Sequence, residues 1–348
     1  MIRVAINGFG RIGRIAFRQM LTSPDFMVVA INSRSGDAEE FAYLTKYDTV
    51  HGSFHEDSIG FDNGDLVVSG QGGQTRIKVF NNDNPETLPW RDLNIDLVLE
   101  CTGAFTSVDG ASKHLTAGAK KVLISAPGKD AMPTIVYGVN ENTLLPEHTI
   151  VSAASCTTNC LAPVLNVINQ NIGIEKGFMS TIHAYTSDQS VLDNSHSKGI
   201  ASRRGRACAE NIVPATTGAA KAIGLVIPDL QGKMDGIAYR VPVKDGSLVD
   251  VTLELKRNTT IEEINTLLYN AQNDTIKFTL DPIVSSDVVG KKYGSLVDGR
   301  STAIVENNGR QLVKVVAWYD NEWGYSKRVL DLTKYVGSYL YQREVKIS

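Results

Sequence analysis

The chain has 348 residues, of which 42% are hydrophobic and 21% are charged, and its formal net charge is −3 at pH 7. Since a domain usually has roughly 100–200 residues, this length predicts two domains, and the composition excludes intrinsic disorder and a fibrous repeat. The lack of a basic excess argues against a protein that binds nucleic acid or an anionic membrane surface.

The four cysteines, at positions 101, 156, 160 and 208, are too few for a disulfide framework and lack the paired spacing of a zinc site. The sequence contains neither a signal-peptide pattern nor a run of about 18 apolar residues that could cross a membrane. We therefore expect a cytoplasmic protein with free thiols and without a bound metal.

Residues 1–155 alternate short apolar runs with helical segments. Near-continuous Val, Ile, Leu and Ala is typical of parallel strands covered on both faces, so the pattern predicts a doubly wound α/β domain of the Rossmann type. Residues 50–91, richer in Gly, Asn and Asp, are expected to insert strands and turns. The predicted strands are residues 2–7, 27–32, 95–100, 121–125, 134–138 and 149–152, and the predicted helices are residues 12–21 and 110–117.

A G-x-G-x-x-G loop, formed by Gly8, Gly10 and Gly13, follows the first predicted strand and opens a helix. In this context the glycines let the backbone approach the pyrophosphate of a dinucleotide, which the helix N-terminus then binds. The alternative is a glycine turn that only connects two elements. We expect a dinucleotide-binding site here.

The choice between NAD and NADP depends on the residue about 20 positions after this loop, where an acid usually holds the ribose 2′-hydroxyl. The chain has Ser33 and Arg34 there, which can donate to a 2′-phosphate, so the sequence favours NADP. The alternative is that Arg34 points to solvent and Asp37 supplies the missing acid.

From residue 156 onward the predicted strands are longer and alternate polar with apolar side chains, which is typical of an antiparallel sheet with a polar face or a subunit contact. We expect an α+β catalytic and oligomerisation domain with a mostly antiparallel sheet over residues 156–320. Residues 1–155, completed by the C-terminal helical region 321–348, then form the dinucleotide-binding domain. The predicted elements are helices 158–168, 260–272 and 324–339 and strands 247–256 and 311–319.

Cys156 is the predicted nucleophile, because it stands between a strand and a helix. Helix N–H groups aimed at its sulfur would lower the pKa of the thiol, and a thiolate attacks carbonyl carbon. Thr157 and Thr158 are expected to cap the helix or bind an anion. Cys160, one helical turn on, is expected to be a small buried residue, and a redox pair with Cys156 is the alternative.

A thiol nucleophile needs a base. His183 lies 27 residues after Cys156, a spacing long enough for one helix and one strand that bring the chain back to the same cleft. Position alone does not single it out among the six histidines. Structural histidines at strand ends are common.

Several motifs then occur in one order and together resemble the phosphorylating glyceraldehyde-3-phosphate dehydrogenase family, from residue 1 to about residue 340. The cysteine motif is specific to that family and its near relatives. The motifs are the glycine loop, Ser155-Cys-Thr-Thr-Asn-Cys160, His183-Ala-Tyr-Thr-Ser-Asp-Gln189, Pro214-Ala-Thr-Thr-Gly-Ala-Ala-Lys221, Arg240-Val-Pro242 and Trp318-Tyr-Asp-Asn-Glu-Trp-Gly-Tyr325.

The resemblance implies an NAD(P)-dependent aldehyde dehydrogenase that oxidises D-glyceraldehyde 3-phosphate, with inorganic phosphate, to 1,3-bisphosphoglycerate. Cys156 would form a hemithioacetal and then a thioester, while His183 takes the proton and stabilises the oxyanion. The residues implied to bind substrate or phosphate are Ser155, Thr157, Thr186, Arg204, Thr217, Gly218 and Arg240. Those implied to bind the cofactor are Gly8, Gly10, Arg11, Ile12, Gly13, Asn32, Ser33, Arg34, Thr102, Gly103, Ser125, Ser195, Asn321 and Tyr325.

Two departures from the family pattern concern the cofactor. Ser33 stands where NAD-specific members carry aspartate, and Ser195 stands where they usually carry proline. In the family tetramer the loop that holds Ser195 reaches the adenosine end of a neighbouring subunit's site. Both changes therefore favour NADP over NAD.

Two alternatives concern activity. Erythrose-4-phosphate dehydrogenases share the nucleophile motif, although the sequence after His183 resembles the triose enzyme more closely. A nucleotide-binding regulator without catalysis would need the glycine loop but not Cys156, His183 and Arg240 together.

The resemblance also implies a homotetramer that works in glycolysis or gluconeogenesis, without nucleic acid or a membrane as a required partner. The strand 247–256 is a plausible sheet-to-sheet contact. The basic run 203–206 is expected to serve as an anion site and in interface pairing rather than as a nucleic-acid patch.

Overall fold

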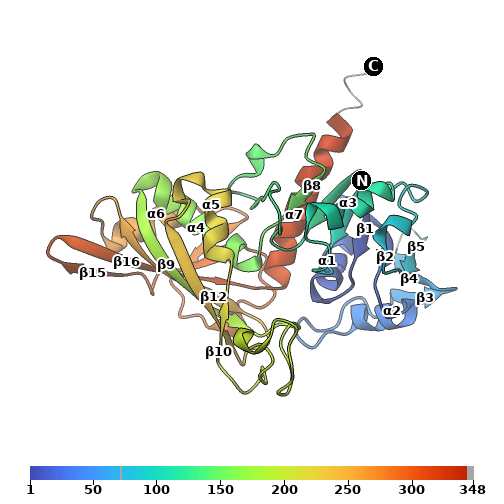
Figure 1. Ribbon diagram of the computed structural model, residues 1–348, viewed down its shortest axis with the longest axis horizontal. Helices are drawn as coiled ribbons and strands as arrows, with labels where there is room; N and C mark the ends of the chain where they lie inside the picture. Colours follow the sequence, from blue (N-terminus) through green and yellow to red (C-terminus); the bar gives the residue numbers. More distant parts are fainter. Residues whose placement is uncertain (71–72, 343–348) are drawn as a thin grey trace. The chain divides into compact units, whose positions relative to one another are not determined.

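The computed structural model describes residues 1–70 and 73–342, and its chain divides into two compact units. The first unit contains residues 1–135, 141–154 and 329–348, and the second contains residues 136–140 and 155–328. Residues 321–328, which are predicted to belong to the nucleotide-binding domain, therefore lie in the second unit. They include the start of the long helix α7 (Trp323–Gln342), drawn in red in Figure 1.

The first unit is built on a sheet in the strand order β3-β4-β5-β2-β1-β6-β7-β8. From β5 to β8 all neighbouring strands are parallel, while β3, β4 and β5 form an antiparallel meander. This is the predicted Rossmann architecture, in which ligands bind beyond the carboxyl ends of the strands where the strand order reverses. The strands are β1 (Ile2–Asn7), β2 (Phe26–Asn32), β3 (Ile59–Asp62), β4 (Asp65–Gly70), β5 (Gly73–Phe80), β6 (Leu97–Glu100), β7 (Lys121–Ile124) and β8 (Ile150–Ser152).

Helices of this unit begin at clear local signals. Ser107 caps α3, and Asp37 caps α2 through a reciprocal capping box with Glu40. By contrast, Gly10 precedes α1 without a side-chain cap. The helices are α1 (Arg11–Leu21), α2 (Ala38–Lys46) and α3 (Val108–Thr116), with short 3₁₀ turns η1 (Pro85–Thr87) and η2 (Glu141–Thr143); α7 (Trp323–Gln342) begins in the second unit and ends in the first.

The second unit is built on a sheet in the order β10-β11-β9-β12-β16-β14-β13, with β15 paired to β16. Only the pairs β9–β11 and β13–β14 are parallel, so the mostly antiparallel sheet of the prediction is confirmed. The strands are β9 (Ile174–Ala184), β10 (Val213–Thr216), β11 (Met234–Val241), β12 (Ser247–Leu255), β13 (Ile276–Thr279), β14 (Ser295–Asp298), β15 (Ala303–Asn307) and β16 (Arg310–Tyr319).

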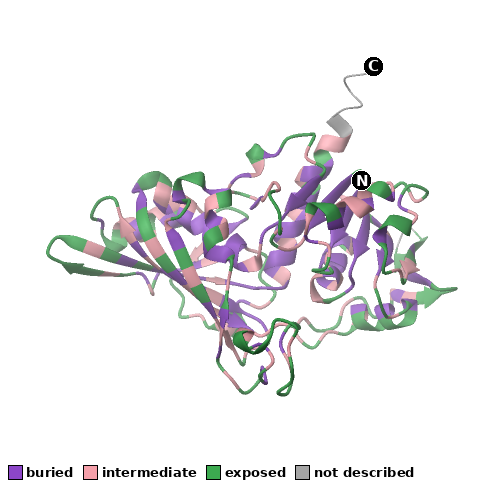
Figure 2. Cartoon of the chain, in the orientation of Figure 1, coloured by how far each residue is buried: buried purple, intermediate pink, exposed green. Residues whose placement is uncertain are grey.

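One face of this sheet is covered by helices and the other is not. The helices α4 (Cys156–Asn171), α5 (Ala219–Val226) and α6 (Ile261–Asn270) contact its strands, and three 3₁₀ turns, η3 (Ile200–Ser202), η4 (Pro228–Leu230) and η5 (Ser285–Asp287), lie in the connections. Figure 2 shows buried and more exposed residues alternating along its long strands, and in β12 the buried set includes Val249, Val251 and Leu253. This alternation follows from the period-2 pattern of the sequence.

The structure differs from the sequence prediction in a predicted strand that is absent and in a helix that was not predicted. Residues 134–138 do not form a strand, because only Thr134 bridges to Ser152 and the chain then turns toward Gly138, which has a φ of +87°. The helix α2 is missed by the sequence analysis, although its Asp37-x-x-Glu40 capping box marks its start. No helix of the described residues is long and apolar enough to span a bilayer.

Candidate active site

The nucleophile candidate, Cys156, is the first residue of α4. Ser155 caps this helix, and its hydroxyl accepts a hydrogen bond from the backbone N–H of Thr158 at 3.1 Å. The cap fixes the backbone that carries the sulfur, because it holds the first turn in place. Cys156 keeps partial contact with solvent, while Cys160 is fully buried with its sulfur 3.7 Å from the Ala317 carbonyl oxygen, as expected of a packing residue.

His183 lies near the end of β9 and faces this sulfur: its Nε2 is 3.4 Å from Sγ of Cys156. The other ring nitrogen, Nδ1, is 2.7 Å from the carbonyl oxygen of Ala184. Nη1 of Arg240, which can only donate, lies farther from Nδ1, at 3.2 Å, and donates to the Thr186 hydroxyl at 2.8 Å instead. The shorter contact, to a carbonyl that only accepts, assigns the proton to Nδ1 and leaves the lone pair of Nε2 toward the thiol. The imidazole is therefore oriented as a base for Cys156.

Burial dominates the protonation of this pair. It raises the pKa of the Cys156 thiol, although the charge of Arg240 and hydrogen bonds at Thr157 oppose the rise. Burial, followed by the charge of Arg240, lowers the pKa of His183 to about 3. The pair is thus a neutral thiol beside a neutral imidazole, whereas the sequence analysis expects the helix N-terminus to lower the thiol pKa.

Tyr319, at the end of β16, is a site residue that the sequence analysis misses. Its buried hydroxyl lies 2.9 Å from the hydroxyl oxygens of both Thr157 and Thr181, and its ring stands edge-on to His183 with centroids 5.8 Å apart. Tyr319 therefore ties the first turn of α4 to β9, the two elements that carry the thiol and the imidazole. Its place at the end of a predicted strand, inside a family motif, is the signal that could have indicated it.

A cluster of anion-binding groups surrounds Arg240. Register places Arg240 of β11 opposite His183 of β9, and its Nη1 donates to the hydroxyl of Thr186 at 2.8 Å. Its Nε is buried and has no hydrogen-bond partner within the described residues. Arg204, which is 9% exposed, forms an ion pair with Asp188. A buried guanidinium with an open donor fits a phosphate oxygen.

Other predicted phosphate residues lie on separate elements. Thr217 accepts a hydrogen bond from the Ala219 backbone at 3.2 Å, and Gly218 is the N-cap of α5. Thr217 also lines a hollow of about 330 Å³ together with Arg203. No described hydrogen bond joins Thr217 or Gly218 to Cys156 or Arg240. Ser195 is exposed, and its backbone N–H donates to the side chain of Asn194.

The glycine loop of the first unit has the geometry that a dinucleotide needs. Gly8 has a φ of +96°, and a Cβ there would lie 2.7 Å from the Thr102 nitrogen, while a Cβ on Gly13 would lie 2.1 Å from the Gly8 carbonyl oxygen. A Cβ on Gly10 would meet nothing within 4 Å. The loop is therefore packed where it supports α1 and open where a pyrophosphate would approach, and the uncapped start of α1 offers N–H groups to it.

A cavity of about 250 Å³ lies near the carboxyl ends of β1 and β2, with Asn32, Ser33, Arg34 and Thr102 in its lining. The side-chain amide of Asn32 donates to the side-chain oxygen of Asn7 at 2.7 Å, which fixes both residues. The Ser33 backbone is held by a hydrogen bond from its N–H to the Phe80 carbonyl at 3.0 Å. These residues fit a ribose and its substituents.

Two residues bear on the absence of an acidic side chain at position 33: Arg34 and Asp37. Arg34 is exposed and pairs with Asp83, its Nε lying 3.0 Å from the carboxylate. Asp37 accepts the Glu40 backbone N–H at 2.9 Å as the cap of α2. One carboxylate oxygen of Asp37 is thus engaged in that cap.

The remaining predicted cofactor residues are held by local contacts. Arg11 pairs with Asp48, Ser125 donates to the Glu100 carbonyl at 3.0 Å, and Gly103 has a φ of +70°. In the second unit, Asn321 accepts a hydrogen bond from the Ser247 hydroxyl at 2.6 Å. Tyr325 is buried, and Ile12 stands in the first turn of α1.

Comparison with known proteins decides the family. Residues 2–108 match the family domain described as "Glyceraldehyde 3-phosphate dehydrogenase, NAD binding domain", and residues 155–321 match its C-terminal domain. The chain belongs to the glyceraldehyde 3-phosphate dehydrogenase family.

Close relatives of this family member extend over nearly the whole chain. A glyceraldehyde-3-phosphate dehydrogenase of Clostridium acetobutylicum is 52% identical over 335 residues, which cover 96% of this chain and 98% of the relative. "Glyceraldehyde-3-phosphate dehydrogenase 2" of Bacillus subtilis is 48% identical over 342 residues, 97% of each chain. The protein of that name in Streptomyces avermitilis is 49% identical over 345 residues, 97% of this chain and 99% of the relative.

Proposed function

We propose that this protein is a phosphorylating glyceraldehyde-3-phosphate dehydrogenase, which oxidises D-glyceraldehyde 3-phosphate with inorganic phosphate and NAD or NADP. The observation that carries the proposal is the 3.4 Å contact between Sγ of Cys156 and the unprotonated Nε2 of His183. Arg240 lies beside that imidazole with a buried open donor. A nucleophile, its base and an anion-binding group are what oxidation of a phosphorylated aldehyde requires.

The acyl-transfer steps follow from these residues. The Cys156 sulfur bonds to the aldehyde carbon while its proton passes to Nε2 of His183, which returns it to the carbonyl oxygen and so forms a hemithioacetal. Once this carbon is oxidised, the acyl group remains on Cys156 as a thioester. A phosphate oxygen then bonds to the acyl carbon, the C–S bond breaks, and the acyl phosphate leaves.

We assign the substrate phosphate to donors from Thr186 and Arg240. We assign the attacking phosphate to Ser155, Thr157, Thr217, Gly218 and Arg240, with Arg204 nearby. The cofactor, when bound, supplies the hydride acceptor. Gly8, Gly10 and Gly13, with Arg11 and Ile12, would hold its pyrophosphate by backbone N–H groups. Asn32, Ser33, Thr102, Gly103 and Ser125 would hold the adenosine side, and Asn321 with Tyr325 the nicotinamide.

We infer that NADP is accepted and favoured over NAD. Supporting this, position 33 is a serine whose hydroxyl faces the cavity at the end of β2, and the nearby Asp37 is engaged as a helix cap. A carboxylate would repel a 2′-phosphate, whereas a hydroxyl donates to it. Arg34 would turn from Asp83 to the phosphate, and Ser195 of a neighbouring subunit would add a hydroxyl.

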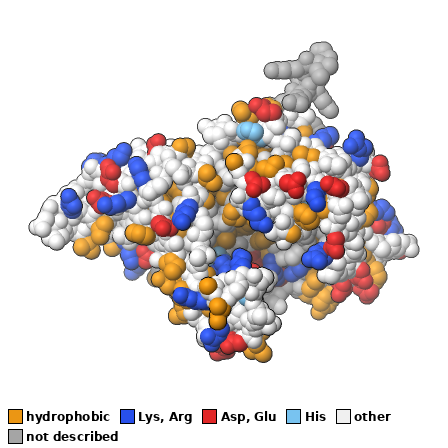
Figure 3. Space-filling model, in the orientation of Figure 1, with side chains coloured by type: hydrophobic (Ala, Val, Ile, Leu, Met, Phe, Trp, Pro, Cys, Tyr) orange, Lys and Arg blue, Asp and Glu red, His pale blue; other side chains and the backbone are white. Residues whose placement is uncertain are grey.

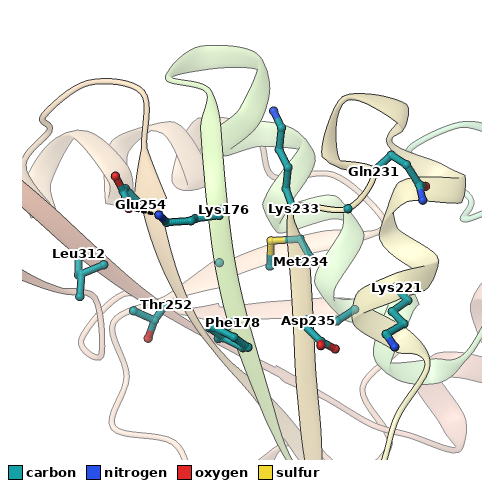
Figure 4. Close-up of a pocket in the computed structure, with 13 residues that line it drawn as sticks. Lys176, Phe178, Lys221, Gln231, Lys233, Met234, Asp235, Thr252, Glu254 and Leu312 are labelled. Atoms are coloured by element: carbon teal, nitrogen blue, oxygen red, sulfur yellow. Dashed lines mark ion pairs between the residues drawn. The ribbon is translucent and has the colours of Figure 1, made fainter.

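We also propose a homotetramer whose contact includes the uncovered face of the second sheet. A hollow of about 650 Å³ opens beside Phe178, Thr252 and Leu312 of this sheet and is also lined by Lys221 of α5. Figure 4 shows these residues, with the ion pair of Lys176 and Glu254 at the hollow. Phe178 is 71% exposed and Leu312 is 51% exposed in the single chain. Apolar side chains gathered on an open sheet face favour burial against another surface.

The cellular setting follows from the same activity: we place the reaction in the cytoplasm, in glycolysis or gluconeogenesis. Basic and acidic side chains are interspersed over the face of the molecule in Figure 3, which does not favour a nucleic-acid surface there.

The proposal is tested by following NAD(P) reduction with D-glyceraldehyde 3-phosphate at increasing phosphate concentrations. We expect reduction to depend on phosphate and to be abolished by Cys156→Ser, because a hydroxyl at that place is a far weaker nucleophile. Cys208→Ser is the matched control and should retain activity. Turnover of erythrose 4-phosphate in preference to the triose, or turnover by Cys156→Ser, would contradict the proposal.

A further inference from the structure

We propose that the Asp188 carboxylate occupies the substrate-phosphate subsite of the free enzyme as an internal counter-anion, which the incoming phosphate must displace. The inference rests on the proposed function, because it concerns Thr186, a donor assigned there to the substrate phosphate, and Arg204, placed there near the attacking phosphate. It assigns Asp188 a role in setting phosphate affinity that its sequence position alone does not indicate.

The contacts of Asp188 carry this inference. One carboxylate oxygen accepts a hydrogen bond from the Thr186 hydroxyl, and the other forms an ion pair with Nη1 of Arg204. Thr186 in turn accepts a hydrogen bond from Arg240 at 2.8 Å. Two of the groups assigned to phosphate, Thr186 and Arg204, therefore already donate to one anion of the protein itself.

The positive charges of Arg204 and Arg240 explain why an anionic side chain is stable at position 188. Arg204 and Arg240 bring two guanidinium groups to the same cluster, and the side chain of Arg204 is only 11% exposed. Burial acts to raise the pKa of Asp188, but the hydrogen bond from Thr186 and the charges of Arg204 and Arg240 hold it below its ordinary value. The carboxylate is thus ionised at neutral pH and compensates part of the positive charge until a phosphate dianion arrives.

The side chain of Asp188 is free to leave while its backbone stays. The side chain of Asp188 is 43% exposed, so rotation about its bonds can carry the carboxylate into water. The loop around it is held by the hydrogen bonds from Ser190 N–H to the Arg204 carbonyl and from Asn194 N–H to the Gly205 carbonyl. Gly205 also lies so close to Asn194 that a Cβ would come within 2.2 Å of its carbonyl oxygen. A packed loop with an exposed carboxylate favours side-chain displacement over loop opening.

The inference predicts that removing this charge strengthens phosphate binding. In Asp188→Asn the amide keeps the shape and can still accept from Arg204, but it no longer competes as an anion. We expect inorganic phosphate to bind the tetrameric enzyme about threefold to tenfold more tightly, the size expected for one partly exposed charge beside a dianion. Calorimetric titration with inorganic phosphate measures this without relying on turnover.

The kinetic counterpart compares two aldehydes. KM for glyceraldehyde 3-phosphate should fall by a similar factor in Asp188→Asn, while kcat/KM for unphosphorylated glyceraldehyde should change less than twofold. Asp193→Asn is the matched control, because Asp193 lies in the same loop and pairs with the exposed Arg206 instead. It should leave both phosphate affinity and KM unchanged.

The outcomes separate the possibilities. Unchanged or weaker phosphate binding by a folded Asp188→Asn enzyme would overturn the inference, since Asp188 would then be holding Arg204 ready for phosphate. Equal changes with both aldehydes would also overturn it. If Asp188→Asn does not fold, Asp188→Ser, which keeps a partner for Thr186, serves instead. Tighter phosphate binding in an enzyme that does not oxidise the triose phosphate would refute the proposed function and leave the subsite inference standing.

Discussion

At the scale of single residues, the proposed reactive pair of Cys156 and His183 depends on one tautomer of the imidazole. The Ala184 carbonyl holds the proton of His183 on Nδ1, and this leaves Nε2 as the acceptor that faces the Cys156 thiol at 3.4 Å. With the pKa of His183 lowered to about 3, the imidazole is neutral at any ordinary working pH. The base is therefore available before substrate binds.

The proposed preference for NADP also rests on single residues. Ser33→Asp should shift preference toward NAD, because the new carboxylate can accept from the ribose hydroxyls and repels a 2′-phosphate. We expect kcat/KM for NADP to fall at least tenfold relative to that for NAD, measured by steady-state kinetics with both cofactors.

Ser58→Asp, which adds the same charge elsewhere in this unit, is the control and should not change the ratio. A wild-type enzyme with a large preference for NAD would contradict the inferred use of NADP, and an unchanged ratio in Ser33→Asp would exclude position 33 as its determinant.

At the scale of elements, the start of α1 is tied to the chain that follows α2. Arg11 forms an ion pair with Asp48, whose side chain is 6% exposed and also accepts the backbone N–H groups of Val50 and His51 at 2.9 Å each. Burial acts to raise the pKa of Asp48, but these hydrogen bonds and the charge of Arg11 hold it well below its ordinary value. The glycine loop that precedes Arg11 is thereby anchored on its helix side.

This anchor predicts a pH-dependent stability. Because the folded-state pKa of Asp48 lies below the unfolded value, its contribution is present above about pH 4 and is lost as pH falls below that value. Asp48→Asn should lower Tm by about 2–4 °C at pH 7, and the difference from wild type should shrink toward pH 3. Thermal unfolding followed by circular dichroism over this pH range measures it.

The exposed pair of Arg76 with Asp62 provides the control, since ion pairs in solvent contribute little. Asp62→Asn should shift Tm by less than about 1 °C. A pH-independent deficit in Asp48→Asn would mean that the charge of this carboxylate does not matter.

At the scale of the whole molecule, the two sheets differ in how their faces are covered. The parallel strands of the first sheet are buried, as Val4, Val98 and Leu123 show with exposures of 0%. The second sheet carries helices on one face and leaves Phe178 and Leu312 in contact with solvent on the other. The proposed tetramer would cover that face.

Assembly can therefore be tested at Phe178. Phe178→Glu should convert the tetramer into smaller species, because a charge buried in an apolar contact is costly. Sedimentation velocity measures the change in mass. Phe61→Glu, at a 50% exposed phenylalanine on β3, should leave the assembly intact. A wild-type monomer would contradict the proposed tetramer.

The sequence predicts much of this molecule because several of its signals are local. The apolar runs predict β1, β2, β6, β7 and β8 to within two residues at either end, and the glycine spacing predicts the start of α1. Local pattern fails where packing or turn chemistry decides, as at residues 134–138, where apolar residues lie in a turn instead of a strand.

The sequence predicts Cys156 as the nucleophile from its place between a strand and a helix, and it predicts most other candidate site residues from the family motifs that contain them. These signals exist in the sequence itself, because backbone geometry at a strand end or a glycine loop depends on a few neighbouring residues.

Tertiary structure decides the rest: the Tyr319 bridge, the neutral state of the thiol and imidazole, and the Asp188 carboxylate between Thr186 and Arg204. These features depend on the distances between residues that are far apart in the chain and on how deeply those residues are buried. Only the folded arrangement of the strands sets the distances and the burial.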